Sequence, residues 1–520
     1  MGMRPLAWLV LVLAAFSIGA TPATAGEAPT RGGTLRFAMI DTPPSLDAHV
    51  LTATLSTTVS QHFLETLFAF TDQYEPVPHL AKSAEVRDGG KLIAIRLREG
   101  VLFHNGKEMT SDDVVASLIR WGKFGARAPN LFQHVERVVT DGKYGVRLYL
   151  KNPFAPWATM LAYANGGPTI YPKEVMDNAT KQPIPPSAYI GTGPYRFVEW
   201  KAGHEIILER FDKYVTRTDK SDGYAGERAA YFDKLVFVPV ADPGTRLNGL
   251  KAGEYDYAEY IPGDLFEGLE KDSSVSIMIR KAAGFGELFF NQKEGMMTNQ
   301  KLRQAMLAAS NMEPVLSASV GPKQLWSLNG ALMPPGTKWF SKVGIEPYSQ
   351  GNAAKARALA KEAGYRGEPI RYMVTTSYAD HYSASVVLVK QLKDAGFNID
   401  MQIYDWATLV SRRAQPGLWD VYYTTHGFVP DPILFTFMNP TYPGWWDSPA
   451  KQQYTAEFTA APDSAKRLAT LEKLQALFYQ EVPLLRTGDT FTYDIYSPRL
   501  RGIAPSTTLN FPSFWNVWRK

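Results

Sequence analysis

The 520-residue chain contains no cysteine. It therefore can form no disulfide bond, and it offers no thiolate nucleophile and no cysteine ligand for a metal. After the N-terminal segment, no apolar run approaches the roughly 20 residues that span a bilayer. The formal net charge is only +4 and no long basic run occurs. Nucleic acid is therefore not an expected partner.

The signatures of common catalytic centres are also missing. There is no G-x-S-x-G nucleophile elbow and no phosphate-binding G-x-x-x-x-G-K-[ST] loop. His204-Glu205 lacks the second histidine of a zinc-binding helix, and Gly284-Phe285-Gly286 lacks a third glycine at the right spacing. We expect no enzyme activity, no cofactor and no metal. A secreted hydrolase stays open as the alternative from a different class, because paired carboxylates have no fixed spacing in sequence.

The N-terminus has the parts of a secretory signal peptide. Arg4 precedes an apolar stretch from Leu6 to about Ile18, which is too short to cross a bilayer. Ala23-Thr24-Ala25 then fits a cleavage site of small residues. We predict that residues 1–25 are removed, the alternative being an uncleaved membrane anchor. Because no cysteine follows, we expect a protein that is free in the periplasm and not lipid-anchored.

The remaining 495 residues are too many for one hydrophobic core and indicate two or three domains. Apolar residues make up 45% and charged residues 20%, as in ordinary globular proteins. The chain is rich in aromatic residues, with 12 Trp and 26 Tyr. Such side chains suit a site that is apolar yet hydrogen-bonding, although most of them can equally fill a large core. No long linker occurs, so the domains must be closely coupled.

Alternating strand and helix signals predict an α/β fold. Period-two alternation indicates strands, whereas i, i+3, i+4 apolar spacing after a capping residue or before a glycine indicates helices. The predicted strands and hairpins cover 34–40, 91–98, 137–150, 195–211 and 397–403, and the predicted helices begin at Thr110 or cover 353–363, 384–395 and 465–480.

Seven segments, read in order, resemble the extracellular solute-binding proteins of family 5, which serve ABC importers for oligopeptides, dipeptides and nickel. The match covers nearly all of the chain after residue 25. The segments are 32–36 with 43–47, 65–68 with 78–81, 97–106 running on to Ser117, Gly191-Thr192-Gly193-Pro194-Tyr195 with Phe197 and Trp200, Phe290-Asn291 with 302–305, Ala363-Gly364-Tyr365, and Asp405-Trp406.

Several of these motifs also have a plain packing explanation. Gly100 and Gly106 flank a tight turn in which Phe103 can be buried. Gly191 and Gly193 would let the backbone turn sharply before a strand. We therefore expect these residues to build the fold and not to form the binding site.

The resemblance implies an α/β, two-lobed periplasmic binding protein fold (type II, cluster C-like) with an extra subdomain on the first lobe. The expected first lobe covers 26–284 with the subdomain at about 50–190, the second lobe covers 285–490, and 491–520 return to the first lobe. Such a protein encloses a solute by hinge closure and delivers it to an ABC permease in the inner membrane. The implied protein is a monomer whose solute is a peptide or a related small molecule. An opine, a sugar conjugate or a chelated metal are the alternatives.

The resemblance also points to candidate ligand-binding residues. Trp406 resembles an aromatic residue that lines the family's pocket. Asp431 falls on the position that pairs with a peptide amine if Gly427-Phe428 replaces the family's Gly-Trp pair. If His426 replaces that Trp, Asp431 matches a structural Asp-Pro and the amine partner is lost. The arginine that binds the carboxylate in dipeptide binders is missing, because Thr375 and Thr376 occupy that neighbourhood.

Further candidates are aromatic. Tyr423, His426 and Phe428 can form pocket walls or belong to the core. Trp445 and Trp446 lie in a loop, where paired Trp side chains are costly to expose, so they can contact a ligand or the other lobe. A lone histidine such as His426 is more often a hydrogen-bonded pocket or core residue than a metal ligand.

Overall fold

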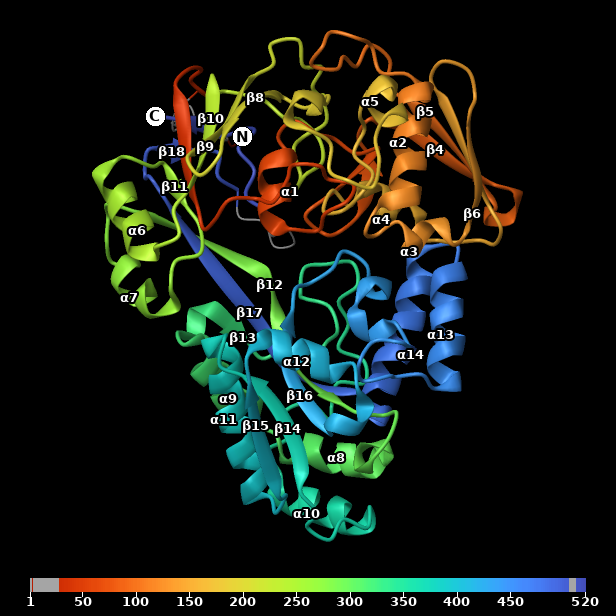
Figure 1. The fold of residues 1–520 in the computed structure, drawn as a ribbon, viewed down its shortest axis with the longest axis vertical. Helices are drawn as coiled ribbons and strands as arrows, with labels where there is room; N and C mark the ends of the chain where they lie inside the picture. The colour runs from red at the N-terminus through yellow and green to blue at the C-terminus, as the bar shows by residue number, and fades with distance from the viewer. Residues whose placement is uncertain (1, 3–27, 505–510) are drawn as a thin grey trace.

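The computed structural model describes Gly2, residues 28–504 and residues 511–520, which fold into two lobes (Figure 1). The predicted signal peptide lies outside the described residues, apart from Gly2. Both described ends of the chain lie in the first lobe, which is the upper one in Figure 1. Within the described residues, no helix has the length and apolar character needed to cross a membrane.

Two long antiparallel strands, β12 (Ser276–Phe290) and β17 (Leu484–Tyr496), run through both lobes and join them (Figure 1). In the first lobe, residues 276–280 pair with 492–496, and in the second lobe 284–289 pair with 484–490. The register shifts between Arg280 and Gly284 and again between Phe285 and Glu287. The predicted lobe boundaries at 284/285 and 490/491 stay predictions, and they fall beside this irregular stretch.

The first-lobe sheet continues from β17, and its core is aromatic. The Phe37 ring lies edge-on to Tyr257 at 5.3 Å and to Phe514 at 5.4 Å. The C-terminal segment thus packs against the first strand of the lobe. In sheet order the strands are β11 (Tyr257–Ala258), β1 (Thr34–Met39), β10 (Lys234–Pro239), β9 (Glu205–Arg210) and β8 (Tyr195–Lys201), and the helices are α1 (Thr54–Ser60), α5 (Lys173–Asp177), α6 (Pro243–Ala252) and α7 (Phe266–Leu269).

A separate four-stranded antiparallel sheet with its helices lies beside the first-lobe sheet (Figure 1). Its main helix begins with a capping box in which Thr110 and Asp113 satisfy each other's backbone N–H groups. The sheet order is β4 (Ala81–Arg87), β5 (Leu92–Leu97), β7 (Gly145–Leu150) and β6 (Val135–Thr140); the helices are α2 (Ser111–Phe124), α3 (Pro129–Phe132) and α4 (Trp157–Ala162), and β2 (Phe68–Phe70) pairs with β3 (Pro76–Pro78).

The second lobe adds parallel strands to β12 and β17. In it, β14 (Ile370–Thr375) pairs in parallel with β15 (Ile399–Tyr404) and with β16 (Val421–His426). Because the strands are parallel, their carboxyl ends lie at one edge of the sheet. The remaining elements are β13 (Trp326–Ser327), which pairs with β17, the β18 (Leu500–Arg501) and β19 (Trp518–Arg519) pair of the first lobe, and the helices α8 (Gln300–Ala309), α9 (Met312–Val320), α10 (Ala353–Glu362), α11 (Ala379–Asp394), α12 (Trp406–Arg413), α13 (Pro449–Ala460) and α14 (Ser464–Glu481).

Most predicted elements are confirmed to within two residues. The helix predicted over 384–395 is an exception, because α11 already begins at Ala379. Phe103 is fully buried, and Gly100 and Gly106 have φ of 73° and 85°, as the turn requires. The chain also bends at Gly193-Pro194, directly before β8, as expected. Neither Gly191 nor Gly193 has a positive φ, and glycine is needed here for close packing, because a Cβ on Gly191 would lie 1.9 Å from the Phe63 carbonyl oxygen.

Candidate functional site

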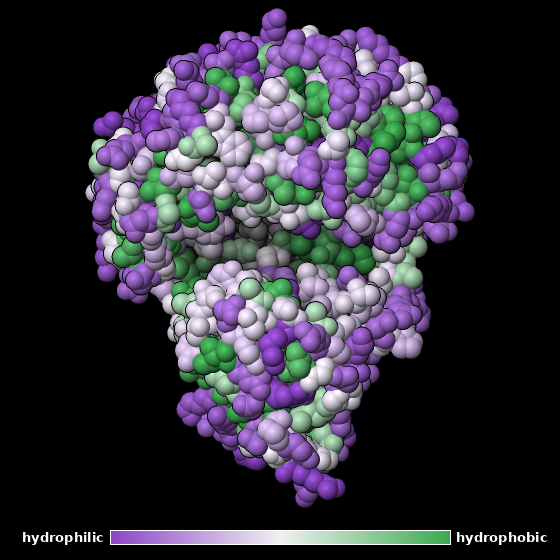
Figure 2. Space-filling model, viewed as in Figure 1, coloured by the Kyte–Doolittle hydropathy of each residue, from purple (hydrophilic) through white to green (hydrophobic). Residues whose placement is uncertain are grey.

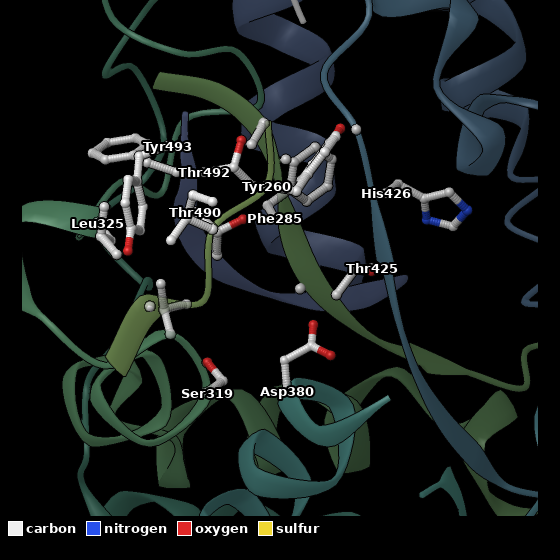
Figure 3. Close-up of a pocket in the computed structure, with 18 of the residues that line it drawn as sticks. Tyr260, Phe285, Ser319, Leu325, Asp380, Thr425, His426, Thr490, Thr492 and Tyr493 are labelled. Atoms are coloured by element: carbon white, nitrogen blue, oxygen red, sulfur yellow. The ribbon is translucent and has the colours of Figure 1, made fainter. Parts of the chain in front are cut away.

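A cavity of about 420 Å³ lies where the two lobes meet (Figure 3). Its walls come from the irregular part of β12, from β17, from the loop after β11, from the end of α9 and from the carboxyl end of β16. The lining residues include Tyr260, Phe285, Ser319, Asp380, Tyr423, Thr425, His426, Thr490 and Thr492.

A second cavity of about 390 Å³ adjoins the first and shares five lining residues with it, among them Tyr260 and His426. First-lobe residues line one side of this second cavity and residues 426–429 and 434–436 line the other. The two cavities together are called the interlobe cleft here, and Figure 2 shows the molecule hollowed between the lobes. The first-lobe residues include Thr52, Thr54, Arg127, Tyr163, Asn165, Tyr260 and Phe511.

The second-lobe topology explains which residues reach the cleft. β14, β15 and β16 end at Thr375, Tyr404 and His426, at one edge of the sheet. The loops and helix starts that follow these ends carry Asp380, Trp406 and the segment after His426. In open α/β sheets ligands bind outside the carboxyl ends of the strands, so this edge is the expected place for a ligand.

Two glycines shape the floor of the first cavity. A Cβ on Gly286 would lie 2.0 Å from the Tyr423 hydroxyl, and one on Gly284 would lie 2.3 Å from the His426 carbonyl oxygen. Only glycine therefore allows β12 and the Tyr423 side chain to approach this closely. The Gly284-Phe285-Gly286 segment thus has a packing role in the cleft.

Among the described residues that line the first cavity, Asp380 is the only one with a carboxylate. It lies in the first turn of α11, and its carboxylate points toward the middle of the cavity (Figure 3). The side chain is 49% exposed, and His381 Nε2 lies 3.9 Å away; burial lowers the pKa of His381, which favours the neutral ring. No hydrogen bond to another described residue engages the carboxylate. It is therefore available to a cationic group of a ligand.

Arg127 is the one arginine or lysine among the described residues that line the second cavity, and it belongs to the first lobe. Its Nε and Nη2 groups donate to the backbone and side-chain oxygens of Asn165 at 2.8 and 3.0 Å. Its guanidinium also lies 4.8 Å from the Tyr163 ring centroid. These contacts hold the guanidinium in place, while Nη1 has no hydrogen-bond partner among the described residues. The arrangement can orient a carboxylate.

His426 lines both cavities, but its side-chain hydrogen bonds are made with residues of its own lobe. Its Nδ1 makes a short hydrogen bond with the buried Glu287 carboxylate, and its Nε2 lies 3.1 Å from the Tyr442 hydroxyl. In Figure 3 the ring points away from the other labelled side chains. His426 is therefore a hydrogen-bonded wall residue. Within residues 28–504 and 511–520, no three His, Asp or Glu side chains gather as a metal site.

The predicted site residues separate into two groups. Tyr423, His426 and Phe428 line the interlobe cleft. Trp406 lies next to it, half-buried against Tyr378 and His381, at ring distances of 5.3 and 5.8 Å.

Asp431, Trp445 and Trp446 lie elsewhere. The Asp431 carboxylate is fully buried and accepts two bonds from Arg467 Nη2, at 3.0 and 2.8 Å. Trp445 stacks on Trp419, and Trp446 is buried with its Nε1 donating to Glu481. For Asp431 this geometry favours the alignment in which it is a structural Asp-Pro residue.

Sequence reasoning missed both charged groups of the cleft. Asp380 follows the end of a parallel strand, and this position could have been singled out by the rule for α/β sheets. Arg127 carried no such signal, because only the folding of the first lobe brings it opposite the second.

A buried charged cluster lies at the lobe connection. Arg280 on β12 pairs with Asp494 on β17 at 3.0 Å, and Tyr257 donates to the same Asp494 carboxylate at 2.7 Å. Glu259 is fully buried beside them, and only its Oε1 is hydrogen-bonded, to the Ile40 N–H at 3.0 Å. Burial raises the pKa of Glu259 to about 7, opposed in part by the Arg280 charge.

This pKa predicts a pH-dependent stability. Between pH 4.5 and 7 the folded state keeps the Glu259 proton while the unfolded state releases it, so the free energy of unfolding falls as pH rises. The fall should reach roughly 3 kcal/mol. We expect Glu259→Gln to unfold with a flatter pH profile than the unmodified protein, measured by denaturant titration at pH 5 and pH 8. The exposed Glu270→Gln is the control, and equal slopes for all three proteins would refute the assignment.

A model of the bacterial extracellular solute-binding proteins, family 5 Middle, matches residues 75–448. The probable peptide ABC transporter periplasmic-binding protein y4tO of Sinorhizobium fredii (strain NBRC 101917 / NGR234) is 29% identical over 495 residues, which cover 91% of each chain. AgaA from A. tumefaciens R10, solved in complex with agropinic acid, is 23% identical with a TM-score of 0.73, over 94% of this chain and 99% of that one. NikA from Brucella suis, solved with Fe(III)-EDTA, is 20% identical with a TM-score of 0.80, over 94% and 100%.

Proposed function

Because the chain belongs to the bacterial extracellular solute-binding proteins, family 5, we propose that it is the periplasmic solute receptor of an ABC importer. The observation that carries this proposal is a cleft lined by both lobes. Among the described elements, the paired strands β12 and β17 run through both lobes and connect them. A solute bound in the cleft contacts both lobes at once. It therefore stabilises the closed form, as a ligand must if it is to shift the equilibrium toward closure.

We further propose that the solute is peptide-like. The relative from S. fredii is named a probable peptide ABC transporter protein. In addition, the cleft offers a carboxylate, Asp380, on the second lobe and a guanidinium, Arg127, on the first. A short peptide carries an amine and a carboxylate that these two groups would bind. The apolar walls formed by Phe285, Phe428 and Phe435 would cover the remainder of the peptide.

Other solutes compete with this assignment. The fold is shared with proteins solved with agropinic acid and with Fe(III)-EDTA, so the fold alone does not decide the ligand class. Asp380 argues for a cationic group on the ligand, because an anionic chelate would be repelled there.

We also propose the export, the oligomeric state and the permease docking that such a receptor requires. The N-terminal segment directs export and is cleaved, and the receptor acts as a monomer without turning over its solute. The closed form then docks on an inner-membrane permease. A secreted hydrolase would have the same cleft but would consume its ligand.

The test is to purify the protein from the periplasm of its host and to release its bound solute for mass spectrometry. We expect peptides, and incubation of the protein with the same peptides should leave them intact. A released opine or metal chelate would replace the peptide assignment, and hydrolysis of the solute would overturn the receptor role.

A further inference from the structure

A third cavity, of about 340 Å³, lies between the lobes on the side of α13. Leu434 lines both this cavity and the interlobe cleft, so the two adjoin. We call it the side chamber. First-lobe residues Asn130, Gln133, His134 and Phe154 line one side, and the second-lobe residues Ile433, Leu434, Met438, Pro440, Asp447, Lys451, Gln452, Thr455, Ala456 and Thr459 line the other.

Most of the surface that the lining turns toward the side chamber is apolar, although polar residues contribute to it. Phe154 stacks on His134 with ring centroids 4.2 Å apart, and Leu434 and Met438 face them across the space. The one buried charge in the lining is already satisfied. Lys451 is 2% exposed, and its Nζ donates to the backbone oxygens of Met438 and Trp446 at 2.8 and 2.7 Å.

Nor is the other charged group in the lining free. The Asp447 carboxylate accepts a hydrogen bond from Gln452 at 2.8 Å. Neither charge of the described lining is free, and its buried unpartnered polar atom is the Thr455 hydroxyl oxygen. The chamber thus offers little to a charged ligand group and suits a mainly apolar one.

The side chamber exists only while the lobes are together. Next to it the Ala155 N–H of the first lobe donates to the Thr459 carbonyl oxygen of α13 at 2.7 Å. Separating the lobes would break this bond and expose the apolar lining of both sides. An apolar group that fills the chamber would therefore favour the closed form.

We propose that the side chamber binds an apolar group of the solute, such as a large aliphatic or aromatic side chain, that extends from the interlobe cleft past Leu434. This inference rests on the proposed function and adds a size and polarity preference to it. Affinity should rise about fourfold for each methylene that enters the chamber.

A variant in which a large side chain fills the side chamber tests the preference for apolar ligand groups. Ala456 lies on the chamber side of α13, and Ala456→Trp would occupy the space. Gln453→Trp on the exposed side of the same helix is the matched control. By calorimetry with Ala-Ala-Ala, Ala-Ala-Phe and Phe-Ala-Ala, we expect the unmodified protein and the control to prefer one phenylalanine peptide by tenfold or more. Ala456→Trp should lose that preference but still bind Ala-Ala-Ala. No preference, or one that survives Ala456→Trp, would overturn the proposal.

A second measurement separates this proposal from the peptide assignment. With 13C-labelled methionine methyl groups, the Met438 signal, assigned through Met438→Leu, reports on the chamber directly. If none of the peptides binds, the peptide assignment fails, and 1-hexanol then serves as the probe. We expect 1-hexanol to shift the Met438 signal in the unmodified protein and not in Ala456→Trp. An unshifted Met438 signal would show that the chamber takes no apolar group.

Discussion

Replacing Asp431 by alanine is expected to destabilise the fold by about 3–5 kcal/mol, because it leaves a buried charge without its partner. Arg467 is 5% exposed, and its Nη2 donates to both oxygens of the Asp431 carboxylate. Among the described residues, Asp431 is its one charged partner. Asp431 Oδ1 also accepts the Ile433 N–H at 3.2 Å at the start of a short 3-10 helix. Denaturant unfolding of Asp431→Ala measures the loss.

A double variant identifies the cause. Asp431→Ala together with Arg467→Met removes both charges, and we expect it to recover much of the stability that the single variant loses. At temperatures where all variants are folded, the affinity for Ala-Ala-Ala should be nearly unchanged. If Asp431 paired with a ligand amine instead, Asp431→Ala would lower that affinity by roughly 2 kcal/mol or more and cost little stability.

The role of Asp431 could not be predicted from the sequence alone. Two alignments were possible because the motif around residues 425–432 fits the family pattern in two registers. The Ile433-Leu434-Phe435 segment that follows favours the structural alignment but does not decide it. The further support comes from a contact with Arg467, 36 residues further along the chain, which packing alone creates.

Local features were easier to predict. Some features depend only on neighbours in sequence, so the sequence pattern alone predicts them. They are the helix start at Thr110, the helix ends before Gly364 and Gly396, and the strands β1 and β5. The 15-residue strand β12 was not predicted, since its length depends on pairing with β17 some 200 residues away in both lobes. The charged groups of the cleft depend in the same way on how the lobes meet.

Replacing Asp380 by asparagine is the second change with a large expected effect, here on binding. The variant keeps the shape of the side chain but removes the negative charge that the described lining of the first cavity carries. A hydrogen bond to a charged group contributes about 2 kcal/mol, so the affinity for a peptide with a free amine should fall roughly thirtyfold. Asp394→Asn, at the other end of α11, is the matched control, since Asp394 only pairs with Lys390 on the exposed surface.

The most direct test of a peptide receptor whose amine site is Asp380 is calorimetric titration with Ala-Ala-Ala and with N-acetyl-Ala-Ala-Ala, which lacks the amine charge. The proposed site predicts that the unmodified protein and Asp394→Asn bind the free-amine peptide at least tenfold more tightly. Asp380→Asn should bind both peptides equally and weakly. Equal binding of the two peptides by the unmodified protein, or a preference for the free amine that persists in Asp380→Asn, would contradict it.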